Sequence, residues 1–387
     1  MGIAGVAATQ HQSAPESPPP AAQAPAAPPA APPATPSSQG TAGAAATAAD
    51  KFTHFRVGNK NVKALFADGP VMWVATSGGL IRYDTRSDGF KLYDNTSGLL
   101  SNGCFSVSRI QGKITVGTYG GGMSVLDEQT ERWTHYNVPE GLGDAFVYDV
   151  LEAANGDIWI ATWSGVNRVR GGHLDDRSAW ELHTVASTQG GLPNDWVYGL
   201  AEAKDGVVWL ATEGGVSRFA GGRWEAWNHA RGIGADYDVV RDAIAYKSDP
   251  GKASSHHAQQ KKEMGLEGVD QAYNPNYIVS LEIDGDGSVW AGTWGGGLAH
   301  YVNGQWHNLT TRDGLPGNHV FMLHRDGQGR LWIGTNNGLA RKDGDGFRLM
   351  RTEDGLFGNA VFSMATSGEG DLWVGSYGGV ARIRPGG

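Results

Sequence analysis

One short pattern recurs along this chain of 387 residues. Each copy has an apolar residue, Trp, a second apolar residue, Ala or Gly, Thr or Ser, one variable residue, and then Gly-Gly or a close variant. The copies read VMWVATSGGL, DIWIATWSGV, VVWLATEGGV, SVWAGTWGGGL, RLWIGTNNGL and DLWVGSYGGV, and a seventh, KITVGTYGGGM, has Ile in place of Trp. Their anchors are Trp73, Ile114, Trp159, Trp209, Trp290, Trp332 and Trp373. Successive anchors lie 41, 45, 50, 81, 42 and 41 residues apart, a period typical of propeller blades.

Two further elements complete each unit. A Gly-Leu pair is followed within a few residues by an apolar strand, as in GLLSNGCFSV, GLGDAFVYDV, GLPNDWVYGL, GLPGNHVFML and GLFGNAVFSM. A short strand with an aromatic residue follows the anchor strand, as in RWTHYNV, RWEAWNH and QWHNLTT. Each unit therefore holds four short strands joined by turns rich in Gly, Asn and Asp. The sequence predicts an all-β fold, a seven-bladed β-propeller.

The two ends of the repeat region complement each other. The last unit supplies three strands and then stops, whereas an extra strand, FTHFRV, precedes the first unit. We expect Phe52–Val57 to pair beside Val380–Arg384, so that the N-terminal strand closes the propeller. A closed ring leaves only short strand edges exposed.

Composition divides the chain into two parts. Residues 1–50 are rich in Pro and Ala and have few large apolar side chains, which predicts a disordered tether. Residues 51–387 form the propeller, with an insertion at about 229–275 that lacks both the Trp pattern and the Gly-Leu element. Long insertions without regular strands are often functional.

Charge and hydropathy exclude several kinds of partner. The net charge is −9 and charged residues make up 18% of the chain, which argues against nucleic acid. No apolar run reaches the ~18–20 residues that a membrane span needs. Residues 1–10 lack the basic and apolar regions of a signal peptide. Cys104 is the single cysteine, so no intrachain disulfide is possible.

The unit that begins at Asp313, DGLPGNHVFMLHRDGQGRLWIGTNNGLARKD, resembles the two-component regulator propeller repeat. The resemblance covers residues 52–385. In that family such repeats usually form the extracytoplasmic sensing part of hybrid sensor kinases, and carbohydrate-derived ligands are typical. The resemblance therefore implies a sensor-like protein in the periplasm or outside the cell. Because no kinase part follows in this sequence, it also implies a separate sensor kinase as a partner.

Propeller geometry indicates where a ligand would bind. The loop that leads into the first strand of a blade and the turn that leaves the second open on one face, around the central channel. The variable turn residues are Ser77, Tyr119, Trp163, Glu213, Trp294, Asn336 and Tyr377, and the loops add Phe146, Trp196, Tyr273, Tyr277 and His319. Aromatic rings on a concave face stack on sugars or bind cations. The predicted ligand-binding residues are Tyr119, Trp163, Glu213, Trp294, Asn336, Tyr377, Trp196 and His319.

The sequence favours a non-catalytic propeller that binds a small polar ligand or a partner protein on this face. One alternative is an assembly scaffold that docks through the 229–275 insertion. A second is a lyase or hydrolase that uses His319, His324 and Glu213 on the channel face. The rings could also simply pack against one another and against the insertion. No catalytic residue, cofactor or metal is predicted, because the histidines lack ligand spacing and the turn at Asp284 has Gly295 where a calcium loop needs Glu.

Overall fold

The computed structural model describes residues 51–244 and 271–384, together with six single residues between them, Ala258, Lys261, Lys262, Met264, Gly268 and Val269. The chain divides into two compact units. One comprises Met1–Gln39 and Lys247–Asp270, and the other comprises Gly40–Tyr246 and Gln271–Gly387. The second unit holds the propeller. The predicted tether and the middle of the predicted insertion lie outside the described residues.

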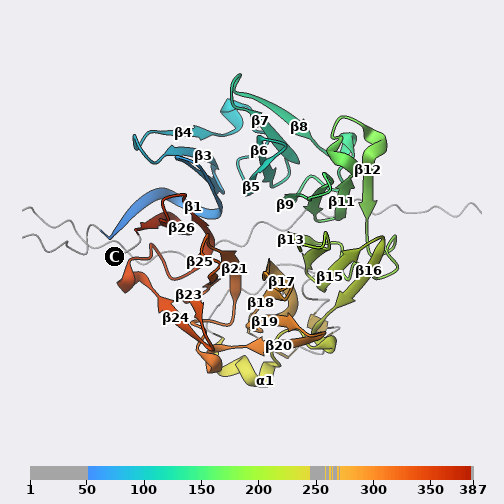
Figure 1. Ribbon diagram of the computed structural model, residues 1–387, viewed down its shortest axis with the longest axis vertical. Coiled ribbons are helices and arrows are strands. Elements are labelled where there is room, and N and C mark those ends of the chain that lie inside the picture. The colour runs from blue at the N-terminus through green and yellow to red at the C-terminus, as the bar shows by residue number, and fades with distance from the viewer. Residues whose placement is uncertain are drawn as a thin grey trace, which may run out of the picture. The chain divides into compact units, whose positions relative to one another are not determined.

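The described part of the chain forms six antiparallel sheets around a common centre (Figure 1). The largest has six strands, in the order β25 (Val361–Thr366), β26 (Leu372–Ile383), β1 (Phe52–Asp68), β2 (Val71–Thr76), β3 (Gly79–Asp84) and β4 (Phe90–Tyr93). Two of the four-stranded sheets are β5 (Cys104–Ile110), β6 (Lys113–Thr118), β7 (Met123–Asp127) and β8 (Arg132–Tyr136), and β9 (Val147–Glu152), β10 (Ile158–Thr162), β11 (Gly165–Val169) and β12 (Trp180–His183).

Three more four-stranded sheets complete the ring. They are β13 (Val197–Glu202), β14 (Val208–Thr212), β15 (Gly215–Ala220) and β16 (Arg223–Trp227); β17 (Asn274–Ile283), β18 (Val289–Trp294), β19 (Leu298–Val302) and β20 (Gln305–Leu309); and β21 (Val320–Arg325), β22 (Leu331–Thr335), β23 (Gly338–Asp343) and β24 (Gly346–Met350). In the described ranges the one α-helix is α1 (Tyr237–Val240). Short 3-10 turns lie at Asn95–Ser97, Val138–Glu140, Arg170–Gly172, Arg177–Ala179, His229–Arg231, Arg241–Ala243, Thr311–Asp313 and Thr352–Asp354.

The all-β propeller is confirmed, but the prediction of seven blades is wrong, because the structure has six sheets. The strands β1 and β26 run unbroken for 17 and 12 residues, so the first and last repeat units share a single sheet. Local sequence does not reveal this continuity, since GNKN at 58–61 has the composition of a loop. Gly58 takes a left-handed φ of +73° where the ladder shifts register, a conformation that suits glycine.

The predicted pairing of the two chain ends is confirmed. β1 pairs with β26 from Phe52 opposite Ile383 to Arg56 opposite Gly379. The same strand then pairs with β2, from Val62 opposite Thr76 onward. In Figure 1 the start of β1, in blue, lies beside the dark red β26. The edge of the last unit is therefore covered by the first strand of the fold.

The anchors of the repeat form the core between neighbouring sheets. All six Trp anchors and Ile114 are buried. Trp159 on β10, for example, packs against Phe219 on β15 and Trp224 on β16 of the next sheet, with ring centroids 5.1 and 6.3 Å apart. Truncating a buried Trp or Phe to Ala typically costs about 3–5 kcal/mol. Repeating one such residue in each unit explains why the Trp pattern dominates the sequence.

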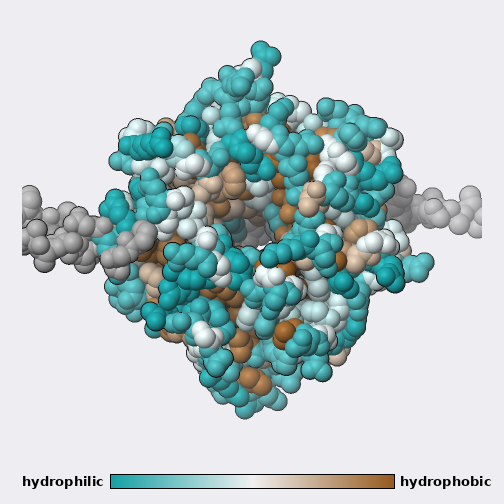
Figure 2. Space-filling view, viewed as in Figure 1, coloured by the Kyte–Doolittle hydropathy of each residue, from teal (hydrophilic) through white to brown (hydrophobic). Residues whose placement is uncertain are grey.

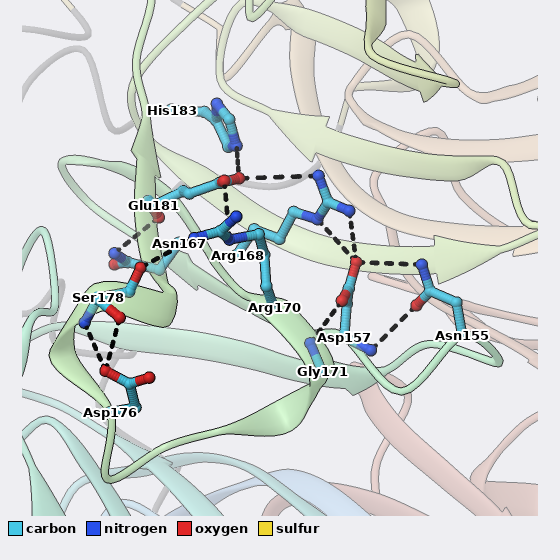
Figure 3. Close-up of polar contacts among 10 residues, drawn as sticks. All are labelled: Asn155, Asp157, Asn167, Arg168, Arg170, Gly171, Asp176, Ser178, Glu181 and His183. Carbon is cyan, nitrogen blue, oxygen red and sulfur yellow. Dashed lines mark hydrogen bonds and ion pairs between the residues drawn. The ribbon is translucent and has the colours of Figure 1, made fainter.

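A polar network fixes the outer strands of the sheet β9–β12 (Figure 3). The Arg168 guanidinium donates to the Asp157 carboxylate through Nε at 2.7 Å and also lies near Glu181, which pairs with Arg170. Burial alone would raise the pKa of Asp157, but the Gly171 amide and Arg168 outweigh it and lower the pKa. The last unit contains an equivalent Arg–Asp pair, in which Arg382 donates to the Asp371 carboxylate at 2.5 Å. This repetition indicates a structural role.

Candidate functional site

In six units a hydroxyl latch shapes the turn that displays the variable residue, whereas Ser376, before Tyr377, donates to the carbonyl of Gly358. The threonine that ends the second strand of a unit donates from Oγ1 to a carbonyl across the turn, as Thr162 does to Gly165 at 2.7 Å and Thr212 to Gly215 at 2.8 Å. The same oxygen accepts the amide of Ser164 or Gly214. Thr76, Thr118, Thr293 and Thr335 make the equivalent bond. The residue after the threonine is thus held in one orientation.

A second repeated feature lies on the innermost strand of each unit. In β1, β5, β9, β13, β21 and β25 the pairing with the next strand shifts register after its first pair, leaving one residue outside the ladder, and β17 does so after its second pair, at Val279. Such bulges redirect a side chain. The residues at this register position are Lys63, Phe105, Tyr148, Tyr198, Val279, Phe321 and Phe362. We call these seven residues the inner ring.

Members of the inner ring meet around the centre of the propeller. Phe105 stacks on Tyr148 with centroids 4.3 Å apart, and Tyr148 meets Tyr198 edge-on at 4.8 Å. Phe321 lies 5.3 Å from Phe362. Because these pairs join strands of different sheets, their side chains face the shared axis. In the space-filling view the molecule is hollowed at its centre, with hydrophobic residues along the border (Figure 2).

Three predicted site residues, Tyr119, Trp163 and Trp196, form one stack on the rim. The Trp163 indole lies between the Phe146 and Trp196 rings, at 4.4 and 4.7 Å and with planes inclined by 13° and 8°. The edge of Tyr119 meets Phe146 at 4.5 Å. Both faces of Trp163 are therefore covered, and a ligand could reach only its edge. We call Tyr119, Phe146, Trp163 and Trp196 the rim stack.

A second group surrounds Trp294. Its indole stacks on Tyr277 at 5.2 Å, meets His319 edge-on at 5.3 Å and lies 5.6 Å from Phe321 of the inner ring. Tyr277 in turn contacts Tyr198 at 4.8 Å. The rim stack, the group around Trp294 and the aromatic residues of the inner ring are thus in continuous contact from β5 to β25.

Of the polar members of the predicted site, Glu213 and His319 are buried and Asn336 is partly buried. Glu213 accepts a hydrogen bond from the Tyr198 hydroxyl at 2.9 Å, and burial raises the pKa of Tyr198 well above its ordinary value, which keeps that hydroxyl a donor. His319 is 1% exposed and donates from Nε2 to the carbonyl of Ala272 at 2.6 Å. Asn336 accepts the amide of His319 through Oδ1 at 3.3 Å. Each of these polar groups bonds within the protein.

The structure therefore brings seven of the eight predicted residues into two adjoining aromatic groups. Tyr377 differs, because it is 37% exposed and, among the described residues, makes no ring contact with the others. The part of the insertion that is described joins this face, since His319 donates from Nε2 to the carbonyl of Ala272 in the insertion. Sequence reasoning missed the inner ring. Aligning the inner strands VKAL, CFSV, VYDV, VYGL, IVSL, VFML and VFSM would have shown it as the second column.

The groups that could carry reactive chemistry near these rings are the Cys104 thiol and the imidazoles of His319 and His324. In the described ranges no three His, Cys, Asp or Glu residues gather as metal ligands would. Burial raises the pKa of the Cys104 thiol to about 12, which makes it a poor nucleophile. His319 and His324 have four residues between them, and each imidazole bonds within the protein, His319 to the Ala272 carbonyl at 2.6 Å and His324 to the Thr366 hydroxyl at 3.0 Å.

Comparison with known families identifies the repeat. The sequence model of the two component regulator propeller matches residues 141–164, 191–214, 272–295 and 314–337. Each matched segment contains an inner strand, its bulge and the latched turn. This chain contains two-component regulator propeller repeats. The resemblance seen in the sequence is confirmed. A comparison with curated protein sequences finds no match.

Solved structures with the same fold have different functions. The extracellular domain of the hybrid two component system BT3049 from B. thetaiotaomicron is 18% identical with a TM-score of 0.64, over 86% of this chain and 41% of that chain. Virginiamycin B lyase from Staphylococcus aureus, solved with quinupristin, is 11% identical with a TM-score of 0.58, over 86% and 99%. YCF48 from Cyanidioschyzon merolae is 11% identical with a TM-score of 0.56, over 87% and 99%. At these identities the likeness shows the fold alone.

In the described ranges no helix is long and apolar enough to span a bilayer.

Proposed function

We propose that this two-component regulator propeller is a non-catalytic, sensor-type binding domain that acts in the periplasm or outside the cell and passes its signal to a separate kinase. The repeat type supports this proposal, because BT3049, which shares the fold, is an extracellular domain of a two component system. The ligand proposed for the rim is a small polar molecule of the carbohydrate class.

The observation that carries the proposal is the concentration of aromatic side chains on one face. The rim stack and the group around Trp294 project from turns that hydroxyl latches hold in place. Such a preorganised surface binds with little loss of side-chain entropy. Because the faces of Trp163 are covered, the ligand would meet ring edges of the rim stack and the half-buried Tyr119, with the exposed Tyr377 as a further contact.

The lyase or hydrolase alternative receives less support. Virginiamycin B lyase shares the fold, yet the candidate groups His319 and Glu213 are buried and bonded within this protein. A general acid or base must reach the proton that it transfers. A scaffold role through the insertion would leave the rim unused, and the same experiment separates it from the sensor proposal.

Calorimetric titration with a panel of neutral oligosaccharides tests the proposal. Tyr119→Ala and Tyr377→Ala each remove one partly accessible ring from the rim, and Phe90→Ala removes a ring that is 74% exposed on the outer strand β4. We expect at least one sugar to bind the wild type and Phe90→Ala equally. We expect about tenfold weaker binding to a rim variant, the effect of losing one aromatic contact. Absence of binding across the panel, or equal binding by all variants, would contradict the proposal.

A further inference from the structure

The inner ring contains one charged residue. Lys63 on β1 holds the register position at which five other inner strands place Phe or Tyr and β17 places Val279. A lysine at a position otherwise kept apolar costs free energy unless its charge is paired or hydrogen-bonded. The rim residues predicted from sequence do not include it.

The surroundings of Lys63 are apolar. Lys63 is partly buried, its ammonium lies over the Phe362 ring at 5.8 Å from the centroid in a cation–π contact, and burial lowers the pKa of the side chain. Among the residues that the structure describes, no carboxylate or other acceptor forms an ion pair or hydrogen bond with it. The buried acid behind the ring, Glu213, bonds to Tyr198, which lies three inner strands away around the ring. The lysine is therefore a cation without a counter-ion inside a hydrophobic channel.

The aromatic members of the ring also favour negative charge. Phe105 and Tyr148 stack face to face with planes inclined by 20°. Stacking in this way on neighbouring inner strands turns the edges of these two rings toward the centre, whereas Tyr148 and Tyr198 meet at 79°. Ring edges carry partial positive charge, whereas ring faces carry partial negative charge. The edges of Phe105 and Tyr148, together with the ammonium, therefore favour an anion over a neutral sugar, which would need open ring faces.

We propose that the central channel binds a small organic monocarboxylate, with its carboxylate on the Lys63 ammonium and its body among the aromatic rings of the inner ring. The single charge of the ring matches a monoanion, and a phosphate or sulfate dianion would remain half uncompensated. The chain's net charge of −9 further disfavours polyanions. The site shares no residue with the eight predicted rim residues, so it stands whether or not the rim binds carbohydrate.

Calorimetry with two carboxylates and their uncharged counterparts tests this site. Benzoate is compared with benzyl alcohol, and glucuronate with glucose, on the wild type and on the variants Lys63→Met, Lys63→Arg and Lys113→Met. Lys113 is exposed on β6, so its substitution removes the same charge outside the channel. We expect a carboxylate to bind the wild type and Lys113→Met equally, to bind Lys63→Arg measurably, and to bind Lys63→Met at least about tenfold more weakly, as loss of a charge-assisted contact implies.

Binding of benzoate alone would assign an aromatic acid, binding of glucuronate alone a sugar acid, and either supports the proposal. It is overturned if neither carboxylate binds the wild type, if the uncharged counterparts bind as tightly, or if Lys63→Met binds a carboxylate as the wild type does. The comparison of charged and uncharged ligands on the wild type needs no variant, so it decides even where Lys63→Met fails to fold. Failure here would leave the carbohydrate titration at the rim unaffected.

Discussion

The Phe55 ring lies over the indole of Trp373, with centroids 5.3 Å apart and planes inclined by 15°. Phe55 belongs to the first strand of the fold and Trp373 is the anchor of the last repeat unit. Tyr83 on β3 also packs against both rings, at 5.0 and 5.7 Å. These three residues join the two ends of the propeller through side chains as well as through the β1–β26 ladder.

Phe55→Ala should weaken this closure. The substitution removes the ring between Trp373 and Tyr83, and we expect the free energy of unfolding to fall by about 2–4 kcal/mol, as for other large-to-small changes in partly buried cores. Urea unfolding followed by Trp fluorescence measures the change. Phe90→Ala, which truncates an exposed Phe in the same sheet, should change it by less than about 0.5 kcal/mol. Equal effects of the two variants would mean that the ends are held by backbone pairing alone.

Asp326 should contribute stability that acid removes. Burial alone would raise its pKa, but hydrogen bonds from the Trp332 indole, from Arg330 and from the Gln328 amide outweigh burial and lower the pKa to about 2. A carboxyl whose pKa falls on folding stabilises the protein at pH values above the pKa it has in the unfolded chain. This contribution is lost as the pH falls toward the pKa of the folded state. Asp326→Asn should therefore cost about 2 kcal/mol at pH 7 and progressively less below pH 4.

The control for Asp326 is Asp345→Asn. Asp345 lies exposed in the turn between β23 and β24. Thermal unfolding of both variants and the wild type at pH 3 and pH 7 gives the comparison. If the cost of Asp326→Asn is the same at both pH values, the ionised carboxylate is not what the hydrogen bonds stabilise.

Asp149 should have the opposite pH dependence. Burial raises its pKa to about 6, although the amides of Leu200 and Val150 donate to its carboxylate at 3.0 and 2.9 Å. The folded state therefore prefers the neutral acid, and this contribution is complete below pH 4 and lost as pH rises through 6. Asp149→Asn removes the charge but keeps only one of the two oxygens that accept these amides, so its stability relative to the wild type should rise by about 1–3 kcal/mol between pH 4 and pH 7.5. The difference between the two melting temperatures should change with pH in this direction, and parallel curves would contradict the argument.

Cys104 should serve as a reporter of unfolding. The thiol is buried at the start of β5, and its raised pKa leaves little thiolate at neutral pH. We expect a disulfide reagent to modify it at pH 8 only as fast as the propeller opens, and to modify it fully in urea. Rapid labelling of the native protein would show that the start of β5 opens without global unfolding.

The sequence predicted the features that each repeat unit carries locally. It did not predict the features that depend on packing and pairing between units. Local patterns that each unit repeats predict three features: the Trp anchors, the turns that follow them, and the pairing of Phe52 with the last unit. The number of sheets did not follow, because the continuity of β1 through Gly58 depends on its partners on both sides. The rim position of Trp163 was predictable, but the covering of its two faces was not, since Phe146 and Trp196 come from separate loops whose rotamers are set by packing.

Lys63→Met should stabilise the protein. Burial lowers the pKa of Lys63, so the folded state bears a cost for its charge at neutral pH, and that cost disappears as pH rises from the folded pKa to the ordinary value of 10.5. Methionine has a similar length and suits an aromatic channel. We expect its melting temperature to exceed that of the wild type by about 2 °C or more at pH 7, with the difference shrinking toward pH 10. Lys113→Met, on the exposed start of β6, should show no such gain.

If Lys63→Met both stabilises the fold and abolishes carboxylate binding, Lys63 is retained for function. Functional sites commonly reduce the stability of a protein in this way. A fall in melting temperature for Lys63→Met would instead show that the ammonium helps to hold the inner ring together.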